Sequence, residues 1–319
     1  MVSKNSAAAA VAREGLTVRP LTPADLASVV AIDAELAGRS RNAYFERRLA
    51  AARREPGMHL QLAVEEKGAL AGYVLGRVLE GEFGRDQPEL RLEVIGVNPA
   101  VQGRGLGAAL GAALEKEARG RGLKEIRTMA LWRAHALLRF LDRAGYRLAR
   151  SHVLDCEANT DFEPQLRDEV HVGVMEQGDL EGIARVDRRL TGRDRRTYLA
   201  RLVDEAFTDS AIRVSLTARV DGGIAGFVMA RVDLGDFGRA EPVAVIDTVG
   251  VDPLRAREGI GRALLSQLFA NLAALRVERV ETVVAPGNLD LMAFFYRAGL
   301  RPSERLAFVK PLALPIPHK

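Results

Sequence analysis

Two short glycine-rich segments are the residues of this sequence best suited to bind a ligand. The first is Gln102-Gly103-Arg104-Gly105-Leu106-Gly107, and the second is Ala256-Arg257-Glu258-Gly259-Ile260-Gly261. Each follows an apolar strand pattern and precedes a helical one. Glycines at such a strand-to-helix turn let backbone N–H groups point at a ligand, and the helix N-terminus adds partial positive charge. Both segments therefore predict a phosphate-binding turn.

The two turns belong to a duplication, because the same residues recur along the chain at a spacing of 154. Recurring pairs include Asp33 and Asp187, Arg41 and Arg195, Tyr44 and Tyr198, Gly72 and Gly226, and Gly145 and Gly299. A chain of 319 residues is long enough for two domains that each bury a core. We therefore expect a flexible N-terminus at 1–15, a domain at 16–155, a polar linker at 156–169, a domain at 170–312 and a tail at 313–319.

Hydrophobic patterning predicts the same order of elements in each copy. In the first copy it predicts strands at 16–21, 59–65, 71–79, 90–97, 125–131 and 146–154, and helices at 26–36, 42–54, 103–119 and 135–143. The strands at 59–65 and 71–79 form a β-hairpin around Lys67-Gly68. The predicted fold class is α/β (α+β), with each copy a mixed, mostly antiparallel sheet flanked by helices.

Composition narrows the compartment and the partners. The single cysteine, Cys156, excludes an intramolecular disulfide, and the histidines show no metal-ligand spacing, so we expect a cytoplasmic protein without metal. No apolar run is long enough to cross a bilayer, so we expect no membrane partner. The net charge of +4 could suit nucleic acid, but no basic run is interleaved with aromatic residues. We therefore expect no nucleic-acid partner.

The order of the elements around the glycine turn resembles that of the GNAT superfamily of N-acetyltransferases, over residues 16–155 and again over 170–312. The resemblance rests on Gln102-x-x-Gly105-x-Gly107 after Val97-x-Pro99, and on Asn288 followed by Phe294-Phe295-Tyr296-x-x-Gly299. The glycines alone are a weak signal, but the strand order and the repetition make it specific. The resemblance implies an acyltransferase that moves an acetyl group from acetyl-CoA to an amine acceptor, by direct attack in a ternary complex.

The resemblance also implies where acetyl-CoA binds. Backbone amides of residues 102–107 and 256–261 would hold its pyrophosphate. The preceding strand would splay from its neighbour, so that Ile95 and Val97, or Val249 and Val251, pair with pantetheine. Asn288 stands at the asparagine position of the family and belongs to the cofactor site of the second half.

The two halves depart from the family pattern in opposite ways. The first half keeps Gln102 but has Asp142 at the tyrosine position, where an ionised carboxylate would repel a leaving thiolate instead of protonating it. The second half has Tyr296 at that position but Ala256 in place of Gln102. Because the pyrophosphate contacts are mostly backbone N–H groups, the second change matters less. We therefore expect the chemistry in the second half, with Tyr296 as the acid.

Three candidate proton-transfer residues each have a structural interpretation beside the catalytic one. Glu93 and Asp247 stand four residues before Val97 and Val251, where a carboxylate could act as the base directly or through water. Either residue could instead be an acid at the start of its strand that pairs with a nearby arginine. Tyr296 could be a core aromatic, because a helix needs a buried face.

The repeated Gly-Arg-x-Arg segments at 38–41 and 192–195 are further candidates. Their arginines could hold a carboxylate or phosphate of the acceptor. We favour a structural interpretation, in which they pair with Asp33 and Asp187.

Two other classes of protein compete with the acetyltransferase. Gly103-x-Gly105-x-x-Ala108 imitates a dinucleotide fingerprint, but the second copy lacks its first glycine and the turn follows a β-hairpin instead of a first parallel strand. A tandem acetyl-CoA binding or sensing protein without transferase activity remains an alternative, because each half lacks something that the family usually has. The identity of the acceptor, and the choice between monomer and homodimer, stay open.

Overall fold

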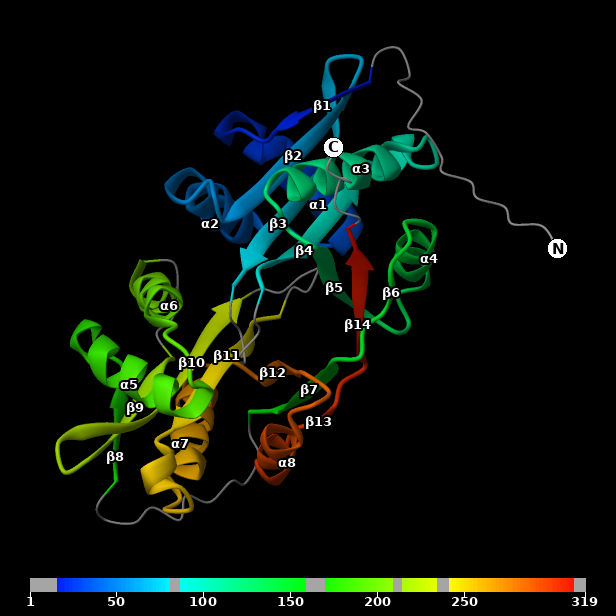
Figure 1. Cartoon of the computed structure of the whole chain (residues 1–319). Helices are drawn as coiled ribbons and strands as arrows, with labels where there is room; N and C mark the ends of the chain where they lie inside the picture. The colour runs from blue at the N-terminus through cyan, green and yellow to red at the C-terminus, as the bar shows by residue number, and fades with distance from the viewer. Residues whose placement is uncertain (1–15, 81–86, 159–169, 209–213, 234–240, 313–319) are drawn as a thin grey trace, which may run out of the picture. The chain divides into compact units, whose positions relative to one another are not determined.

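The computed structural model describes residues 16–80, 87–158, 170–208, 214–233 and 241–312 (Figure 1). The predicted N-terminus at 1–15, most of the predicted linker and the predicted tail at 313–319 lie outside these residues. The described residues group into two compact units. The first is built from those of 1–78, 90–126 and 310–319, and the second from those of 79–89 and 127–309.

The first repeat follows the predicted order of elements. It contains β1 (Leu16–Pro20), η1 (Pro23–Asp25), α1 (Leu26–Ala37), α2 (Asn42–Arg54), β2 (His59–Glu66), β3 (Ala69–Leu79), β4 (Glu89–Val97), η3 (Pro99–Val101), α3 (Leu106–Gly120), β5 (Glu125–Leu131) and α4 (His135–Arg143). The helix predicted at 103–119 begins later, because Gly103 and Gly105 adopt φ of 79° and 86° and so extend the turn before it.

The single strand predicted at 146–154 is wrong. This stretch forms two strands, β6 (Arg147–Leu148) and β7 (His152–Glu157), which belong to different sheets. Between them, Ala149 donates its backbone N–H to the carbonyl of Ala307 at 2.8 Å, after which the chain leaves the first sheet. β7 also continues two residues into the predicted linker. An apolar pattern indicates extended backbone but not the partner strand, so it could not reveal the break.

The second repeat reproduces the first. It contains β8 (His171–Val174), η4 (Gln177–Asp179), α5 (Leu180–Thr191), α6 (Arg196–Thr208), β9 (Leu216–Val220), β10 (Gly223–Asp233), β11 (Val243–Val251), η5 (Pro253–Arg255), α7 (Ile260–Ala274), β12 (Arg279–Val284), α8 (Leu289–Arg297), β13 (Arg301–Pro302) and β14 (Arg305–Pro311). α3 and α7, which follow the two glycine turns, begin and end at equivalent residues.

The strands form two seven-stranded sheets, in the orders β1-β2-β3-β4-β5-β14-β6 and β13-β7-β12-β11-β10-β9-β8 (Figure 1). Each sheet therefore takes a strand from the other repeat. β14 pairs with β6 at Phe308 and Leu148, and β7 pairs with β12 at Cys156 and Val280. β11 and β12 are parallel, whereas the pairs β9–β10 and β10–β11 are antiparallel. The predicted α/β class, with mixed sheets flanked by helices, is confirmed.

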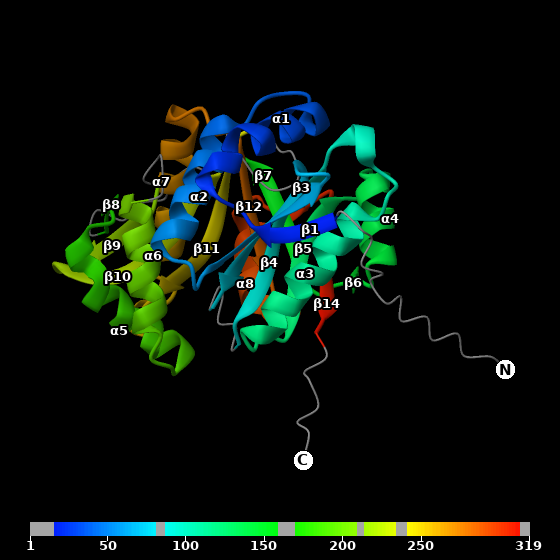
Figure 2. The same cartoon turned by 90° about the horizontal axis from the view of Figure 1, so that it is seen from above.

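The second sheet buries side chains on both faces. Along β10, Val228 and Ala230 belong to the core beneath α7, whereas Phe227 and Met229 belong to the core beneath α5 and α6. Figure 2 shows α5 and α7 on opposite sides of β10 and β11. The apolar face of α7, which includes the fully buried Leu264, anchors this helix to the sheet. Its N-terminus is thereby fixed at the glycine turn.

Candidate functional site

A cavity of about 930 Å³ lies in the second unit, at the N-terminus of α7. Its walls come from the end of β11, the glycine turn, the first turn of α7, the cavity-facing side of α8 and the end of α5 with the loop that follows. It brings together most of the second-half residues predicted to bind cofactor, namely Val249, Val251, Ala256, Arg257, Gly259, Ile260, Gly261 and Asn288. Glu258 is not part of the lining, and its carboxylate lies 3.6 Å from Nη1 of Arg255.

One wall of the cavity is the free edge of β11. The ladder between β11 and β12 joins Val243, Ala244 and Val245 to Arg279, Val280 and Glu281. Beyond this ladder, Thr248 to Val251 line the cavity. The two parallel strands therefore separate toward the turn, as the resemblance implied. Along this stretch, the β11 edge can offer backbone donors and acceptors to an extended ligand.

The glycine turn keeps one backbone shape in both repeats. Gly259 has φ of 83° and Gly105 has φ of 86°. At the first glycine position, Gly103 has φ of 79° and Arg257 keeps the left-handed region at 68°. A side chain in this region costs on the order of 1–2 kcal/mol, so the second repeat holds its turn against local strain.

The helix that begins at the turn presents an N-terminus of the kind that suits anions. The first backbone N–H groups of a helix have no acceptor one turn earlier, and they carry the positive end of the helix dipole. The absence of a side chain at Gly261 keeps this end open, because a Cβ there would approach Cε2 of Phe294 to 3.0 Å. Phe294 itself lines the cavity from α8.

Charged side chains around the cavity are mainly positive. The lining contains two aspartates and five arginines, which are Asp187, Asp290, Arg193, Arg195, Arg257, Arg262 and Arg297. Asp187 is neutralised by Arg195, whose Nη2 lies 2.5 Å from its carboxylate. The remaining excess of arginine favours a ligand with several negative charges. The sequence analysis did not identify Arg262 and Arg297, although Phe294 and Arg297 are spaced to share one face of α8.

Asn288 has a local structural role within the lining. It is the N-cap of α8, and its side-chain oxygen accepts a hydrogen bond from the backbone N–H of Leu291 at 3.1 Å. This cap fixes the start of α8 and hence the position of Phe294. Asn288 therefore shapes the cavity through the helix that it caps.

The two predicted bases are both buried and paired with arginine. Asp247, 7% exposed, forms an ion pair with Arg231 on β10, and Glu93, 2% exposed, forms one with Arg48 on α2. The pairing weighed in the sequence analysis is thus confirmed for both acids. Asp247 is not part of the cavity lining, although Thr248 beside it is. The role of either acid as a base stays a prediction.

Tyr296 lies away from the cavity. Its side chain is 41% exposed, and the Arg301 guanidinium lies 5.3 Å from its ring centroid. Tyr296 follows Phe294 by two residues, which turns it about 200° around the helix. The interpretation of Tyr296 as a core aromatic is wrong, because Phe295 is the buried ring of this helix. Its role as an acid stays a prediction that the cavity lining does not support.

The first-half turn is held by contacts of its own side chains. Gln102 donates a hydrogen bond from Nε2 to the carbonyl of Val97 at 3.1 Å, and Arg104 lies 3.2 Å from the Glu66 carboxylate. Leu106 is buried, whereas Ile95 and Val97 on β4 are half-buried. In this structure Gln102 therefore ties the turn to the end of β4. Ala256 cannot make this contact.

The last arginine of each Gly-Arg-x-Arg segment has the structural role that we favoured, whereas Arg193 lines the cavity. Arg41 donates to Asp33 from Nε at 2.7 Å, and Arg195 donates to Asp187 from Nε at 2.9 Å. In the first repeat Tyr73 also donates to Asp33 at 2.8 Å, and burial raises the pKa of its hydroxyl. Asp187 and Arg195, unlike Asp33 and Arg41, belong to the lining of the cavity at the N-terminus of α7.

Within the described ranges, no three His, Cys, Asp or Glu side chains are grouped to hold a metal ion. No helix in that part of the chain has the length and apolar character needed to span a membrane.

Comparisons with known proteins agree with the duplication. Residues 27–146 and 181–300 each match the Acetyltransferase (GNAT) family. The chain is 31% identical over 220 residues to a mycothiol acetyltransferase of Clavibacter sepedonicus, a match that covers 64% of this chain and 67% of that protein. It is 34% identical over 110 residues to the mycothiol acetyltransferase of Clavibacter michiganensis subsp. michiganensis, which covers 34% and 33% of the two chains.

Two solved structures share the fold along nearly the whole chain. A tandem GNAT protein from the clavulanic acid biosynthesis pathway is 18% identical with a TM-score of 0.65, over 93% of this chain and 99% of that chain. A GCN5-related N-acetyltransferase from Sphaerobacter thermophilus is 20% identical with a TM-score of 0.59, over 95% and 98%.

Proposed function

We propose, from the premise that this chain belongs to the GNAT family of acetyltransferases, that its second repeat carries the transfer of acetyl from acetyl-CoA to an amine. Membership of the family makes the chain an N-acetyltransferase, and the family uses acetyl-CoA as the acetyl donor. The observation that carries the proposal is the cavity at the N-terminus of α7. It joins a phosphate-binding turn, an open strand edge and an excess of arginine in one place.

The lining residues fit the parts of acetyl-CoA. Backbone N–H groups of the turn at 256–261 would hold the pyrophosphate, and the arginines around it would balance the phosphate charges. Val249 and Val251 on the open edge of β11 would pair with the amides of pantetheine. Bound in this way, acetyl-CoA supplies a thioester that an amine can attack directly.

The proton transfers of the reaction need a base and an acid near the thioester. Asp247 stays the candidate base, because the residue after it lines the cavity, and Tyr296 stays the candidate acid. Asp247→Asn should lower kcat, and unchanged kinetics would exclude this base. Tyr296→Phe keeps the ring and removes the hydroxyl, so a full rate in this variant would exclude this acid.

A matched pair of substitutions tests which turn works. Ala256 and Gln102 occupy equivalent positions with extended backbone, so each accepts glutamate without strain. Ala256→Glu puts a negative charge at the proposed pyrophosphate site and should weaken acetyl-CoA binding in calorimetry and lower turnover. Ala256→Gln, of the same size but neutral, should retain both. Gln102→Glu should leave turnover unchanged, and turnover lost only in Gln102→Glu would place the chemistry in the first repeat.

The non-catalytic alternative is tested by the same titration. If the unmodified chain is a sensing protein, it should bind acetyl-CoA in this titration, and no amine in a broad screen should release CoA from it. Release of CoA that depends on both the amine and an unmodified Ala256 turn would exclude that alternative.

A narrower proposal concerns the acceptor. The curated relatives with 31% and 34% identity are named mycothiol acetyltransferases, so we propose a mycothiol-type amine as the acceptor. The test compares kcat/KM for that amine with values for amino sugars, polyamines and N-terminal peptides. A higher kcat/KM for any of these other amines would refute the narrower proposal and leave the broader one intact.

A further inference from the structure

A second cavity, of about 540 Å³, lies in the first unit and shares no residue with the proposed acetyl-CoA site. It is formed where α2 and α3 end beside β1 and β2. Its apolar lining includes Leu49, Leu60 and Leu62. A volume of a few hundred cubic ångströms with an apolar floor is typical of sites for small organic ligands.

Three cations surround this apolar floor. They are Arg53 on α2, Lys116 on α3 and Arg121 just after α3. None of the three forms an ion pair with a residue that the structure describes, and Glu117 is the only acid in the lining. The lining therefore combines an apolar body with positive charge that no protein carboxylate balances.

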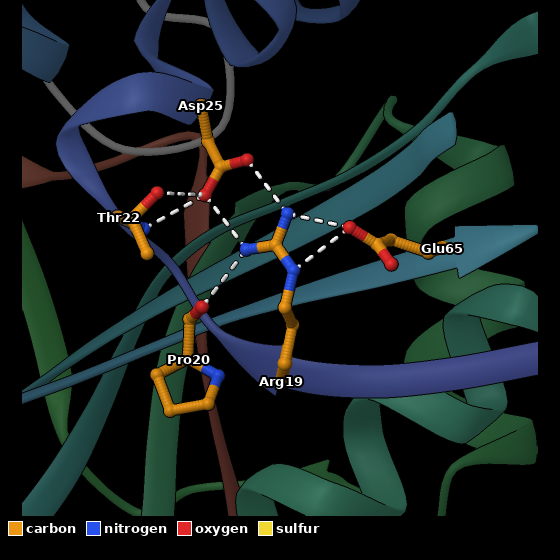
Figure 3. Close-up of polar contacts among 5 residues, drawn as sticks. All are labelled: Arg19, Pro20, Thr22, Asp25 and Glu65. Atoms are coloured by element: carbon orange, nitrogen blue, oxygen red, sulfur yellow. Dashed lines mark hydrogen bonds and ion pairs between the residues drawn. The ribbon is translucent and has the colours of Figure 1, made fainter. Parts of the chain in front are cut away.

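The other arginine of the lining is already neutralised. Figure 3 shows Arg19 between Asp25 and Glu65, with ion-pair distances of 2.8 and 2.6 Å. It also donates to the Pro20 carbonyl. Arg121 has a different environment, because its Nη1 donates to the backbone carbonyls of Pro56 and Gly57 at 3.0 and 2.8 Å. These contacts hold the guanidinium in place without cancelling its charge.

The second repeat shows that the fold does not require these cations. At the positions equivalent to Arg53, Lys116 and Arg121 it has Phe207, Ala270 and Leu275. Its helices α6 and α7 end without the three charges. The charges are thus particular to the first repeat, and stabilisation of helix C-termini alone does not account for all three.

We propose that this cavity binds a small organic anion, in which an apolar body carries one phosphate or carboxylate group. The apolar body would lie against Leu49, Leu60 and Leu62. The anionic group would be shared by Arg53, Lys116 and Arg121, of which Arg121 is already positioned. The proposal does not depend on the acceptor or on which repeat is catalytic.

Phenyl phosphate is the probe, titrated by calorimetry into the full chain saturated with acetyl-CoA, so that the turn sites are occupied. We expect one binding event that weakens as salt increases. Inorganic phosphate lacks the apolar body and benzyl alcohol lacks the charge, so each should bind at least tenfold more weakly. No binding of phenyl phosphate, or equal binding of benzyl alcohol, would overturn the proposal.

The variant that tests the residues uses the side chains of the second repeat, as Arg53→Phe, Lys116→Ala and Arg121→Leu together. It should reduce the affinity for phenyl phosphate at least tenfold. The matched control removes three exposed arginines elsewhere, as Arg143→Ala, Arg147→Ala and Arg150→Ala, and should retain the affinity. If the first variant does not fold, Lys116→Ala alone is the substitute. It should fold, since Lys116 is exposed and has no ion pair to lose among the described residues, and it should still weaken binding because one positive charge is removed. Equal loss in the control, or none in either cavity variant, would refute the site.

Discussion

Arg257 offers the sharpest test of the proposed cofactor site. It stands at the position of Gly103 and lines the cavity with φ of 68°. Arg276 is an independent counterpart, because it stands at the position of Gly122, has φ of 56° and is not part of the lining. The second repeat therefore has arginine at two left-handed positions where the first has glycine, and only one of the two lines the cavity.

The expected change in stability is similar for Arg257→Gly and Arg276→Gly. Releasing a side chain from the left-handed region gains about 1–2 kcal/mol. The greater freedom of glycine in the unfolded chain offsets about 0.5–1 kcal/mol of this. Each variant should therefore raise the free energy of unfolding by about 0.5–1 kcal/mol, measured by urea denaturation without ligand.

The expected change in affinity differs between the two variants. A hydrogen bond to a charged group contributes about 1.5–3 kcal/mol, and the exposure of Arg257 places its contribution at the lower end. Arg257→Gly should therefore weaken acetyl-CoA binding about tenfold, and Arg276→Gly should leave it unchanged. Calorimetric titration at two salt concentrations measures both effects, and the loss should shrink as salt rises.

Two results would refute this reasoning. If Arg257→Gly gains stability and binds acetyl-CoA as tightly as the unmodified chain, the arginine is neutral toward the ligand. If both variants lose affinity equally, the loss comes from the backbone of α7 and not from a contact at the turn.

Three further predictions concern stability and reactivity. The hydrogen bond from Arg19 lowers the pKa of Asp25 from 3.8 to about 2. The contribution of the ionised Asp25 to the free energy of unfolding is therefore complete above pH 4 and is lost between pH 4 and pH 2. Asp25→Asn should thus cost about 2 kcal/mol at pH 7 and little below pH 2, which urea unfolding across that range would check. Burial raises the pKa of Cys156 to about 12, so an aromatic disulfide reagent at pH 8 should label the unfolded chain and not the folded one. Glu281→Gln leaves the buried Arg305 without its carboxylate and should cost about 3–5 kcal/mol, whereas Glu281→Leu with Arg305→Met should cost less in the same denaturation assay.

Local sequence signals predicted most of the elements. The bounds of α2, β5 and α4 match the expectation residue for residue, and Pro56-Gly57 and Gly145 stand shortly after the two helices. The start of α3 was placed too early, since the left-handed glycines lengthen the turn. The missed break between β6 and β7 has a different cause. It depends on pairing with β14 and β12, which lie far along the chain.

The candidate site was predicted where its chemistry resides in the backbone. The turn at 256–261 and the open edge of β11 follow from glycine positions and strand order, which the sequence displays directly. Tyr296 shows the limit of this approach. A motif places a residue on a helix, but only the packing of Phe294 and Phe295 decides which side of α8 faces the cavity. The ion pair of Asp247 depended in the same way on Arg231 of a neighbouring strand.

The acid in the first helix of each repeat and the arginine after that helix reveal a difference between the two repeats. In the first repeat Tyr73 donates to Asp33, whose carboxylate also accepts from Arg41. In the second repeat the tyrosine position is Phe227, which keeps the ring but cannot donate. A Cβ at Gly250 would meet this ring at 2.7 Å, so glycine is still required beside it. The packing is thus retained while Asp187, a residue of the cavity lining, has one donor fewer than Asp33. The loss of this donor leaves Arg195 as the side-chain partner of the Asp187 carboxylate among the described residues.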